Sequence, residues 1–247
     1  MSDVLLFMGG GGGGIPVLTN LQGWWKADAG VYSDAGTTAC VDNDPVYQWS
    51  DQSGNGRHFS QSNAAYRPTF KTGIVNAKPV IRFSSAGATD AMTNGYTFAS
   101  FATASEFTFF SVAKWSNAGS LWSETNNYVI QYHTGTTIDD YNNDGTYDIA
   151  QKACALSTWV IVTYQHFGGV IYTGVNDTRA ASLGSTASGN TAALSGAPVL
   201  GYNFSIGSNP FNGDVAEIAA YNVGLGEENR KSIERYLAAK YGISLPY

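Results

Sequence analysis

The stretch that decides the fold is Val46-Tyr47-Gln48-Trp49-Ser50-Asp51-Gln52-Ser53-Gly54-Asn55-Gly56-Arg57. A short β-forming run ends at its tryptophan, and a segment rich in aspartate, serine, asparagine and glycine follows. Asp and Asn side chains bond to their own backbone and glycine permits positive φ, so Asp51 to Gly56 is predicted to form a tight loop. We expect Trp49 and the earlier Trp25 to be buried anchors beside this loop.

Short β-forming runs punctuated by glycine, asparagine, serine and proline continue to about residue 222. In Phe107–Trp115 the large apolar residues alternate, as on one face of a strand. The runs 159–165 and 170–175 flank Gly168-Gly169, which predicts a β-hairpin. Further strands are expected at 46–49, 80–83, 128–132, 199–202 and 215–221. Many short strands without alternating helices predict an all-β antiparallel sandwich or barrel.

One helix is predicted at the end of the chain, over residues 226–241. Ile233, Leu237 and Tyr241 repeat every four residues and form one apolar stripe. Gly242 follows at the position of a C-terminal glycine cap. We expect the stripe to pack against the sandwich, so that residues 15–247 form one domain with this helix included.

Composition and charge exclude several classes of protein. Of the 247 residues 43% are hydrophobic and 13% aromatic, which favours a large core over disorder. The net charge is −6 and no basic stripe is present, so nucleic acid is excluded as a partner. No apolar run approaches the ~20 residues of a membrane span. Cys40 and Cys154 are expected to be two independent small residues and not a disulfide.

Residues 1–14 are predicted to form an arm. Six consecutive glycines, Gly9 to Gly14, follow a short apolar patch, and Asp3 stands where a secretion signal would carry basic residues. Two interpretations stay open: a disordered tail, or a tether whose tip docks on a neighbouring chain and makes the protein multi-copy or oligomeric. The candidate anchoring residues are Val4, Leu5, Leu6, Phe7 and Met8.

Several segments, in order along residues 17–245, resemble the laminin-G-like jelly rolls of the concanavalin A-like lectin/glucanase superfamily. The segments are 23–30, 46–57, 67–68, 78–83, 213–218 and 234–243. The resemblance implies an antiparallel jelly-roll β-sandwich with one C-terminal α-helix. It says little about the ligand, because this fold carries lectins, enzymes and structural modules.

Glycoside hydrolysis needs two carboxylates about 5–10 Å apart. The glucanases of the superfamily carry a Glu-x-Asp-x-(x)-Glu strand, and none of the six glutamates of this chain lies in such a pattern. Asp214 and Glu217 are three apart, which places them on opposite faces of a regular strand, and we expect Glu217 to face outward. The histidines follow no triad or metal spacing. We therefore expect no enzyme, no catalytic residues and no required cofactor.

Two alternatives stay open for the acidic stretch 139–148. Asp140, Asn142 and Asp144 reproduce the first half of a D-x-N-x-D-G calcium loop. Gln151 stands where such a loop places its bidentate glutamate, so a complete EF-hand is excluded. The alternative is an Asn-Asp-Gly hairpin tip with solvated acids and no calcium.

The same region offers candidates for sugar binding, which would combine an aromatic platform with amide hydrogen bonds. The candidates are Trp122, Tyr128, Tyr132, Tyr141 and Asn143. Some of these aromatic side chains must also be core residues.

The combined pattern resembles small laminin-G-like virion proteins of bacteriophages. This resemblance implies a structural protein on the virion surface, assembled in the host cytoplasm as a capsid decoration or a tail-associated, receptor-binding module. Its partners would be other virion proteins, through the arm, and host-surface glycans. The alternatives are a secreted or cell-surface carbohydrate-binding or adhesion protein and, third, a glycoside hydrolase.

Overall fold

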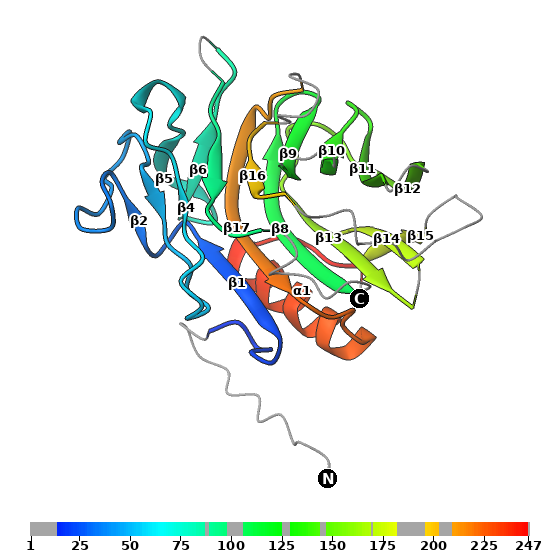
Figure 1. The fold of residues 1–247 in the computed structure, drawn as a ribbon. Coiled ribbons are helices and arrows are strands. Elements are labelled where there is room, and N and C mark those ends of the chain that lie inside the picture. Colours follow the sequence, from blue (N-terminus) through cyan, green and yellow to red (C-terminus); the bar gives the residue numbers. More distant parts are fainter. Residues whose placement is uncertain are drawn as a thin grey trace.

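The chain forms two stacked antiparallel β-sheets and one C-terminal helix (Figure 1), which confirms the expected all-β sandwich. The computed structural model describes residues 14–86, 89–97, 106–124, 129–143, 147–168, 170–181, 196–202 and 209–246, and the structural statements below concern these residues. The apolar arm tip, Val4 to Met8, lies outside them. Within this part of the chain, no helix is long and apolar enough to cross a membrane.

Sheet A has eight strands, all of them paired antiparallel. Their order is β15 (Thr178–Ala181), β14 (Val170–Val175), β13 (Val160–Phe167), β8 (Phe107–Trp115), β17 (Gly213–Tyr221), β6 (Lys78–Phe83) and β5 (Thr69–Val75). The eighth strand, β1 (Leu21–Lys26), pairs with the second half of β17. The predicted hairpin is confirmed, because β13 and β14 pair directly.

Sheet B has nine strands and is also antiparallel. Their order is β12 (Tyr147–Ala153), β11 (Thr137–Asn143), β10 (Val129–His133), β9 (Gly119–Glu124), β16 (Pro198–Leu200), β7 (Met92–Asn94), β4 (Phe59–Ser60), β3 (Gln48–Trp49) and β2 (Val31–Tyr32). A short 3₁₀ helix, η1, spans Ala64–Tyr66. Each strand expected from the sequence is present, with bounds shifted by a few residues.

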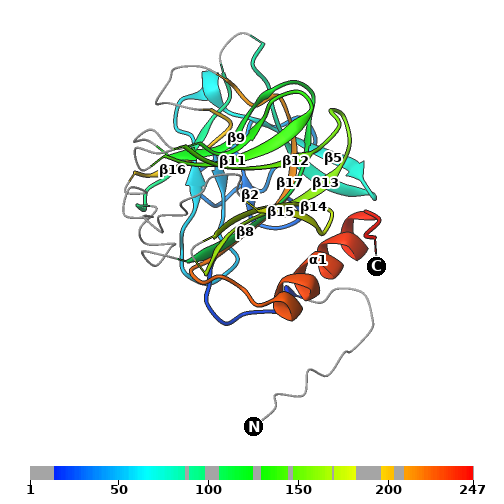
Figure 2. The ribbon, with the colours of Figure 1, turned by 90° about the vertical axis from the view of Figure 1, so that its right-hand side faces the viewer.

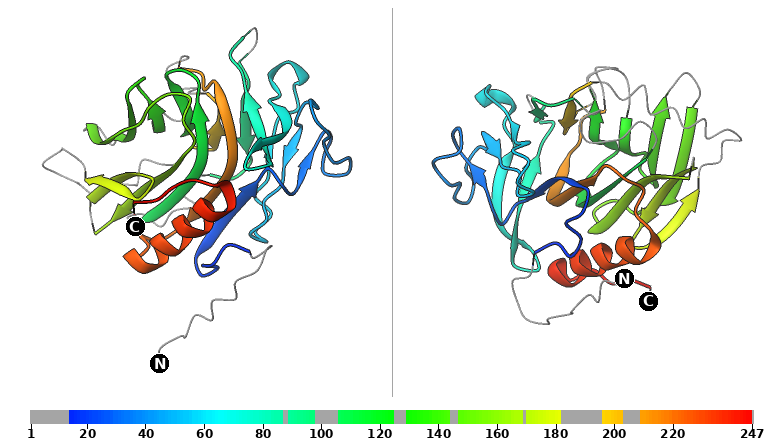
Figure 3. Two further views of the ribbon diagram at one scale, coloured as in Figure 1. Left: turned by 180° about the vertical axis from the view of Figure 1, so that it is seen from behind. Right: turned by 60° about the horizontal axis from the view of Figure 1, so that its bottom comes forward.

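Helix α1 (Glu227–Tyr241) covers the face of sheet A that points away from sheet B (Figure 2). Gly242 ends the helix in the left-handed conformation, and its N–H donates to the Ala238 carbonyl, as a C-terminal glycine cap does. The apolar stripe of α1 is buried between the helix and sheet A, at Ile233, Leu237 and Tyr241. Sheet A is therefore covered on both faces, and Figure 3 shows α1 lying across its strands.

The inter-sheet core is aromatic. Trp25 and Trp49 are fully buried, which confirms them as anchors. The Trp25 ring meets Phe59 edge-on with centroids 4.8 Å apart, and Trp122 stacks on Phe109 at 5.4 Å. Such pairs add about 0.5–1.5 kcal/mol each beyond their buried area.

The Asp51 carboxylate joins the predicted loop to β1. It is 8% exposed. Its Oδ1 accepts hydrogen bonds from the Trp24 N–H (2.9 Å) and the Ser53 N–H (2.8 Å). Its Oδ2 accepts from Ser53 Oγ (2.8 Å) and the Arg57 N–H (3.1 Å). One buried side chain thus fixes both ends of the loop.

The same loop closes the free edge of β1, which pairs with β17 on its other side. Asn55 Nδ2 donates to the Leu21 carbonyl (3.0 Å), and Arg57 Nη1 donates to the Gln22 carbonyl (2.9 Å). Backbone groups left unpaired at a sheet edge invite other chains to pair with them. The side chains of the loop therefore bond to β1 carbonyl groups that a neighbouring strand would otherwise pair with.

Cys40 and Cys154 are both free, as expected. The Cys40 N–H bonds to Val31 of β2 and the Cys154 N–H bonds to Thr136 beside β11, near opposite ends of the nine-stranded sheet. Their Cα atoms are several strands apart, whereas a disulfide needs about 7 Å or less.

We predict that Asp51→Ala lowers the free energy of unfolding by at least about 3 kcal/mol, because three backbone N–H groups lose a charged acceptor at about 1–3 kcal/mol each. Urea unfolding measures the loss. The matched control is Asp42→Ala, which removes an exposed carboxylate from the Thr72 N–H and is expected to destabilise the protein far less. A loss at position 51 no larger than that at position 42 would contradict the role given to Asp51.

We predict that Leu237→Ala, at a side chain 1% exposed, destabilises the protein by about 2–5 kcal/mol. The exposed control on the same helix, Asn229→Ala, is expected to change stability by about 0.5 kcal/mol or less. Equal midpoints for the two variants in chemical denaturation would show that α1 is peripheral to the fold.

Candidate functional site

Glu217 is buried, and the expectation that it faces outward is wrong. Its side chain is 0% exposed. Its Oε1 accepts from Trp24 Nε1 (2.6 Å), and its Oε2 accepts from Lys240 Nζ (2.7 Å) and Tyr241 Oη (2.7 Å). Burial raises the pKa of Tyr241 far above its usual value, and the nearby Glu217 charge adds to this effect. This carboxylate ties the end of α1 to sheet A.

Glu217 is buried because α1 covers the outer face of sheet A. A β-bulge overturns the further expectation that Asp214 and Glu217 lie on opposite faces. Val215 pairs with Ala113 and Glu217 pairs with Val112, so Ala216 has no partner on β8. Val215 and Ile218 both point into the inter-sheet core. Asp214 precedes Val215 and Glu217 precedes Ile218, so both acids point to the other face of the sheet. The bulge breaks the alternation that predicted opposite faces, and the two acids share one side of β17.

Asp214 is as firmly held as Glu217. Its side chain is 3% exposed and bonds to Arg82 through two hydrogen bonds (2.6 and 3.1 Å) and to Lys114 (3.0 Å). Hydrogen bonding to Asp214 raises the pKa of Arg82. Within the described residues, each buried acid bonds to protein groups: Asp51, Asp90, Asp139, Asp214, Glu217 and Glu234. These carboxylates stabilise the fold.

The histidines have structural positions. His58 is exposed, and its Nδ1 accepts from the Asp51 N–H (3.1 Å). His133 is fully buried against Trp115, and its Nδ1 accepts from the Gly135 N–H (2.8 Å). Burial lowers the pKa of His133, so its ring is neutral at physiological pH.

The structure does not bring the predicted sugar-binding residues together in one described site. Trp122 is 3% exposed in the inter-sheet core, so its ring offers no platform for a sugar. Tyr128 lies outside the described residues. Tyr132 in β10 pairs with Asp139 in β11, and Tyr141 and Asn143 occupy backbone positions two and four residues beyond Asp139. These three positions stay predictions.

The described part of the acidic stretch lies in β11 and β12, which pair antiparallel from Thr137 with Ala153 to Asn143 with Tyr147, as the hairpin alternative requires. Asp140 and Asn142 lie within β11, opposite Ala150 and Asp148. Asp144 lies outside the described residues, so calcium at Asp140, Asn142 and Asp144 stays a prediction.

A row of polar residues crosses the face of sheet B that points away from sheet A. Tyr32 pairs with Gln48, Gln48 with Ser60, and Ser60 with Thr93. Directly paired residues share one face of a sheet. On the opposite face, their neighbours Val31, Trp49, Phe59 and Met92 point into the core. The row spans three strand spacings, about 14 Å at 4.7–4.9 Å each.

The row is accessible to solvent at these four positions. Thr93 is exposed, and Tyr32, Gln48 and Ser60 are half-buried. Gln48 Nε2 donates to Ser50 Oγ (2.8 Å), which fixes the orientation of its amide. The row then continues into Val199 and Ser123, which are buried. An amide held in one orientation beside three hydroxyl groups can bond to a polyhydroxylated ligand.

Further polar contacts lie near the ends of β3 and β4. Gln61, next to Ser60, donates from Nε2 to the Ala91 carbonyl (2.7 Å). The Arg67 guanidinium lies 4.8 Å from the centroid of the Tyr47 ring and donates from Nε to the Gln61 carbonyl (2.9 Å). Tyr47 and Gln61 alternate with Gln48 and Ser60 along the chain, so these groups are not counted in the row.

Sequence reasoning missed this row because its strands have only two or three residues and show no periodicity. The stretch from Val46 to Arg57 does contain one signal for the row, at Gln48 and Trp49. If Trp49 points inward, alternation makes Gln48 point outward. The partners of Gln48 follow only from strand pairing, which one sequence does not reveal.

No protein-family model matches the chain, and no curated protein matches it. Solved structures do. Domain 4 of AbnA, a GH43 extracellular arabinanase from Geobacillus stearothermophilus, in complex with arabinotriose, superposes with a TM-score of 0.55 at 11% identity, covering 87% of this chain and 98% of that domain. An arabinofuranosidase complexed with arabinofuranosyl-alpha-1,2-xylobiose superposes with a TM-score of 0.54 at 13% identity. The match covers 80% of this chain and 51% of the arabinofuranosidase chain.

Trypanosoma rangeli sialidase in complex with sialic acid gives a TM-score of 0.53 at 11% identity, covering 96% of this chain. The chain spans about a third of the sialidase (36%) and about half of the arabinofuranosidase (51%). Such low identities establish the fold alone: a β-sandwich of the kind found in carbohydrate-binding and glycosidase-type proteins.

Proposed function

We propose that the protein binds glycans without cleaving them, through the outer face of sheet B. The observation that carries the proposal is the row Tyr32, Gln48, Ser60 and Thr93, which presents three hydroxyl groups and one oriented amide on neighbouring strands. The strand spacing of about 4.8 Å is similar to the width of a sugar ring, so successive rings of a linear glycan can meet successive strands.

The placement of the acids supports binding over hydrolysis. A glycosidase needs two carboxyl groups on opposite sides of the scissile bond. Asp214 and Glu217 share a face, but both are buried on the α1 side of sheet A, and each is held by two or three protein partners. The named neighbour structures with bound sugars add a precedent for sugar recognition on this fold.

We also propose, on the sequence resemblance alone, that the protein is displayed on a bacteriophage virion and held there by its arm. The apolar residues Val4 to Met8 before six glycines support this part. A secreted or cell-surface adhesion protein is the alternative. Mass spectrometry of purified particles, compared with culture supernatant and cell-surface fractions, distinguishes the two. Absence from purified particles would contradict virion display.

We predict that the wild-type protein binds glycans on an array and that Ser60→Ala combined with Thr93→Ala weakens the binding on the order of tenfold, since two hydrogen bonds are lost at about 0.5–1.5 kcal/mol each. Calorimetry with the best array ligand, and with arabinotriose, measures the affinity. Both positions are accessible hydroxyls, so the melting temperature should be unchanged.

The control is Ser244→Ala, an exposed serine after α1 and far along the chain from sheet B. Unchanged affinity in the double variant would exclude the row as the site. Release of reducing sugar from a bound glycan, lost in Glu217→Gln, would show that the protein is an enzyme.

A further inference from the structure

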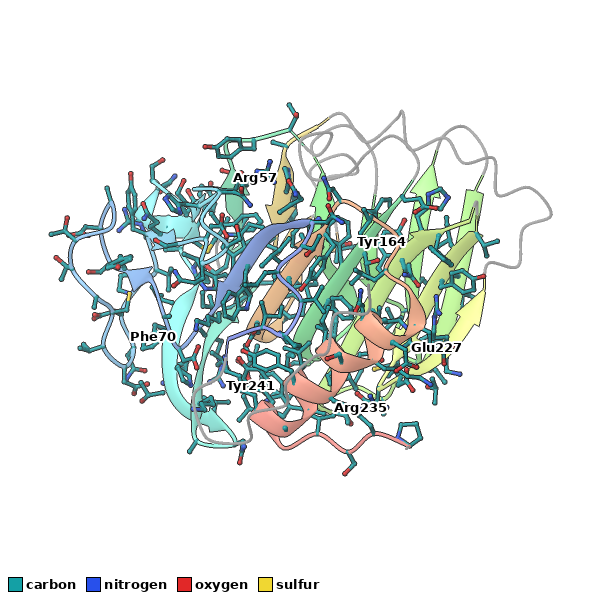
Figure 4. The ribbon with its side chains drawn as sticks, turned by 90° about the horizontal axis from the view of Figure 1, so that it is seen from below. Arg57, Phe70, Tyr164, Glu227, Arg235 and Tyr241 are labelled. Carbon is teal, nitrogen blue, oxygen red and sulfur yellow. The ribbon has the colours of Figure 1, made fainter. Side chains whose placement is uncertain are left out.

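Two acidic residues and one arginine meet between α1 and the β14–β15 hairpin. Arg230 and Glu234 lie one turn apart on α1, and Asp177 lies in the turn that joins β14 to β15. Arg230 Nη1 donates to both Asp177 Oδ1 and Glu234 Oε2. Figure 4 marks Glu227 at this end of the helix and Tyr241 at the other.

This cluster is buried. The side chains of Arg230, Glu234 and Asp177 are 3%, 0% and 7% exposed. Thr163 of β13 donates from Oγ1 to Glu234 Oε1 (2.7 Å). Gly174 of β14 leaves room for the Thr163 side chain, because a Cβ at position 174 would lie 3.3 Å from Thr163 Cβ. The carboxyl groups of Asp177 and Glu234 thus bond to the same nitrogen, Arg230 Nη1, which brings the two acids close together.

Other charges face the cluster from each neighbouring element. From β15, Arg179 donates to Gln165 Oε1 and lies over Tyr172, and its charge acts on Arg230 and Glu234. From α1, Lys231 acts on Asp177 and is paired with the exposed Glu227 (2.6 Å). Arg230 nevertheless bonds directly to both Asp177 and Glu234.

Two buried carboxyl groups held on one guanidinium nitrogen disfavour each other's ionisation, because their like charges repel. Burial raises the pKa of Glu234 to about 7, from an ordinary value of 4.5, and the hydrogen bond to Asp177 adds to the rise. Burial also acts to raise the pKa of Asp177, but its hydrogen bonds to Glu234 and Arg230 outweigh this and keep the pKa below 3.8. The pair therefore holds one proton in mildly acidic solution.

We propose that Asp177, Arg230 and Glu234 form a pH-sensitive clasp, which holds the β14–β15 hairpin against α1 in mildly acidic solution and loosens as the solution becomes alkaline. Above neutrality both carboxyl groups are ionised, and they repel each other with one direct cation, Arg230, between them. The hairpin lies at the edge of sheet A, where β15 has β14 as its described strand partner. Loosening there leaves the centre of the sandwich intact.

The direction of the stability effect follows from proton linkage. Glu234 binds its proton more tightly in the folded than in the unfolded chain, so its contribution is complete below about pH 4.5. That contribution is lost as the pH rises to about 7, and it stays lost above that value.

Amide hydrogen exchange, measured by mass spectrometry between about pH 5 and pH 8 and corrected for the intrinsic rate, tests the clasp. We expect exchange in the β14–β15 peptide to speed up on the order of fivefold relative to the β8 peptide across this range. Glu234→Gln carries a neutral amide and should remove the pH dependence. Glu228→Gln, exposed on the same helix, should keep it.

A wild-type hairpin whose exchange follows that of β8 at each pH would overturn the proposal. So would a Glu234→Gln protein with the same pH dependence as the wild type. If Glu234→Gln does not fold, Thr163→Val replaces it. Losing the Thr163 donor disfavours the ionised Glu234, so the transition must move to higher pH, and an unmoved transition also overturns the proposal.

Discussion

The sandwich depends on the Asp51 carboxylate, which accepts four hydrogen bonds and holds the loop that closes the free edge of β1. β1 carries Trp24 and Trp25, which point into the two different cores of the protein. A loop that fixes the backbone of this strand therefore positions the packing on both faces of sheet A. Charged acceptors in buried sites form stronger hydrogen bonds than neutral ones, which suits Asp51 to this role.

Glu217 performs a comparable task on the α1 face of sheet A. It joins β17 to Trp24 of β1 and to Lys240 and Tyr241 of α1. The Asp177–Arg230–Glu234 cluster fixes the N-terminal half of the same helix. The buried acids Glu217 and Glu234 thus attach α1 to sheet A. The accessible polar row, and with it the proposed glycan site, lies on the outer face of sheet B.

Much of the fold could be predicted from local chemistry. The Asp51 loop, the β13–β14 hairpin and α1 each follow from turn residues, glycine or a four-residue apolar repeat. Non-local features could not be predicted. The bulge at Ala216 reverses the face of Glu217, and no sequence signal marks it. Trp122 was a candidate for sugar binding, but it pairs with Leu200 of β16 and lies in the core.

The central claim is that sheet B binds glycan on its outer face. NMR chemical-shift mapping with a bound oligosaccharide tests it most directly. The account predicts that the largest shifts occur at Gln48, Ser60 and Thr93, with small shifts along α1 and β17. Shifts concentrated instead around Asp214 and Glu217, or at the β14–β15 hairpin, would contradict it.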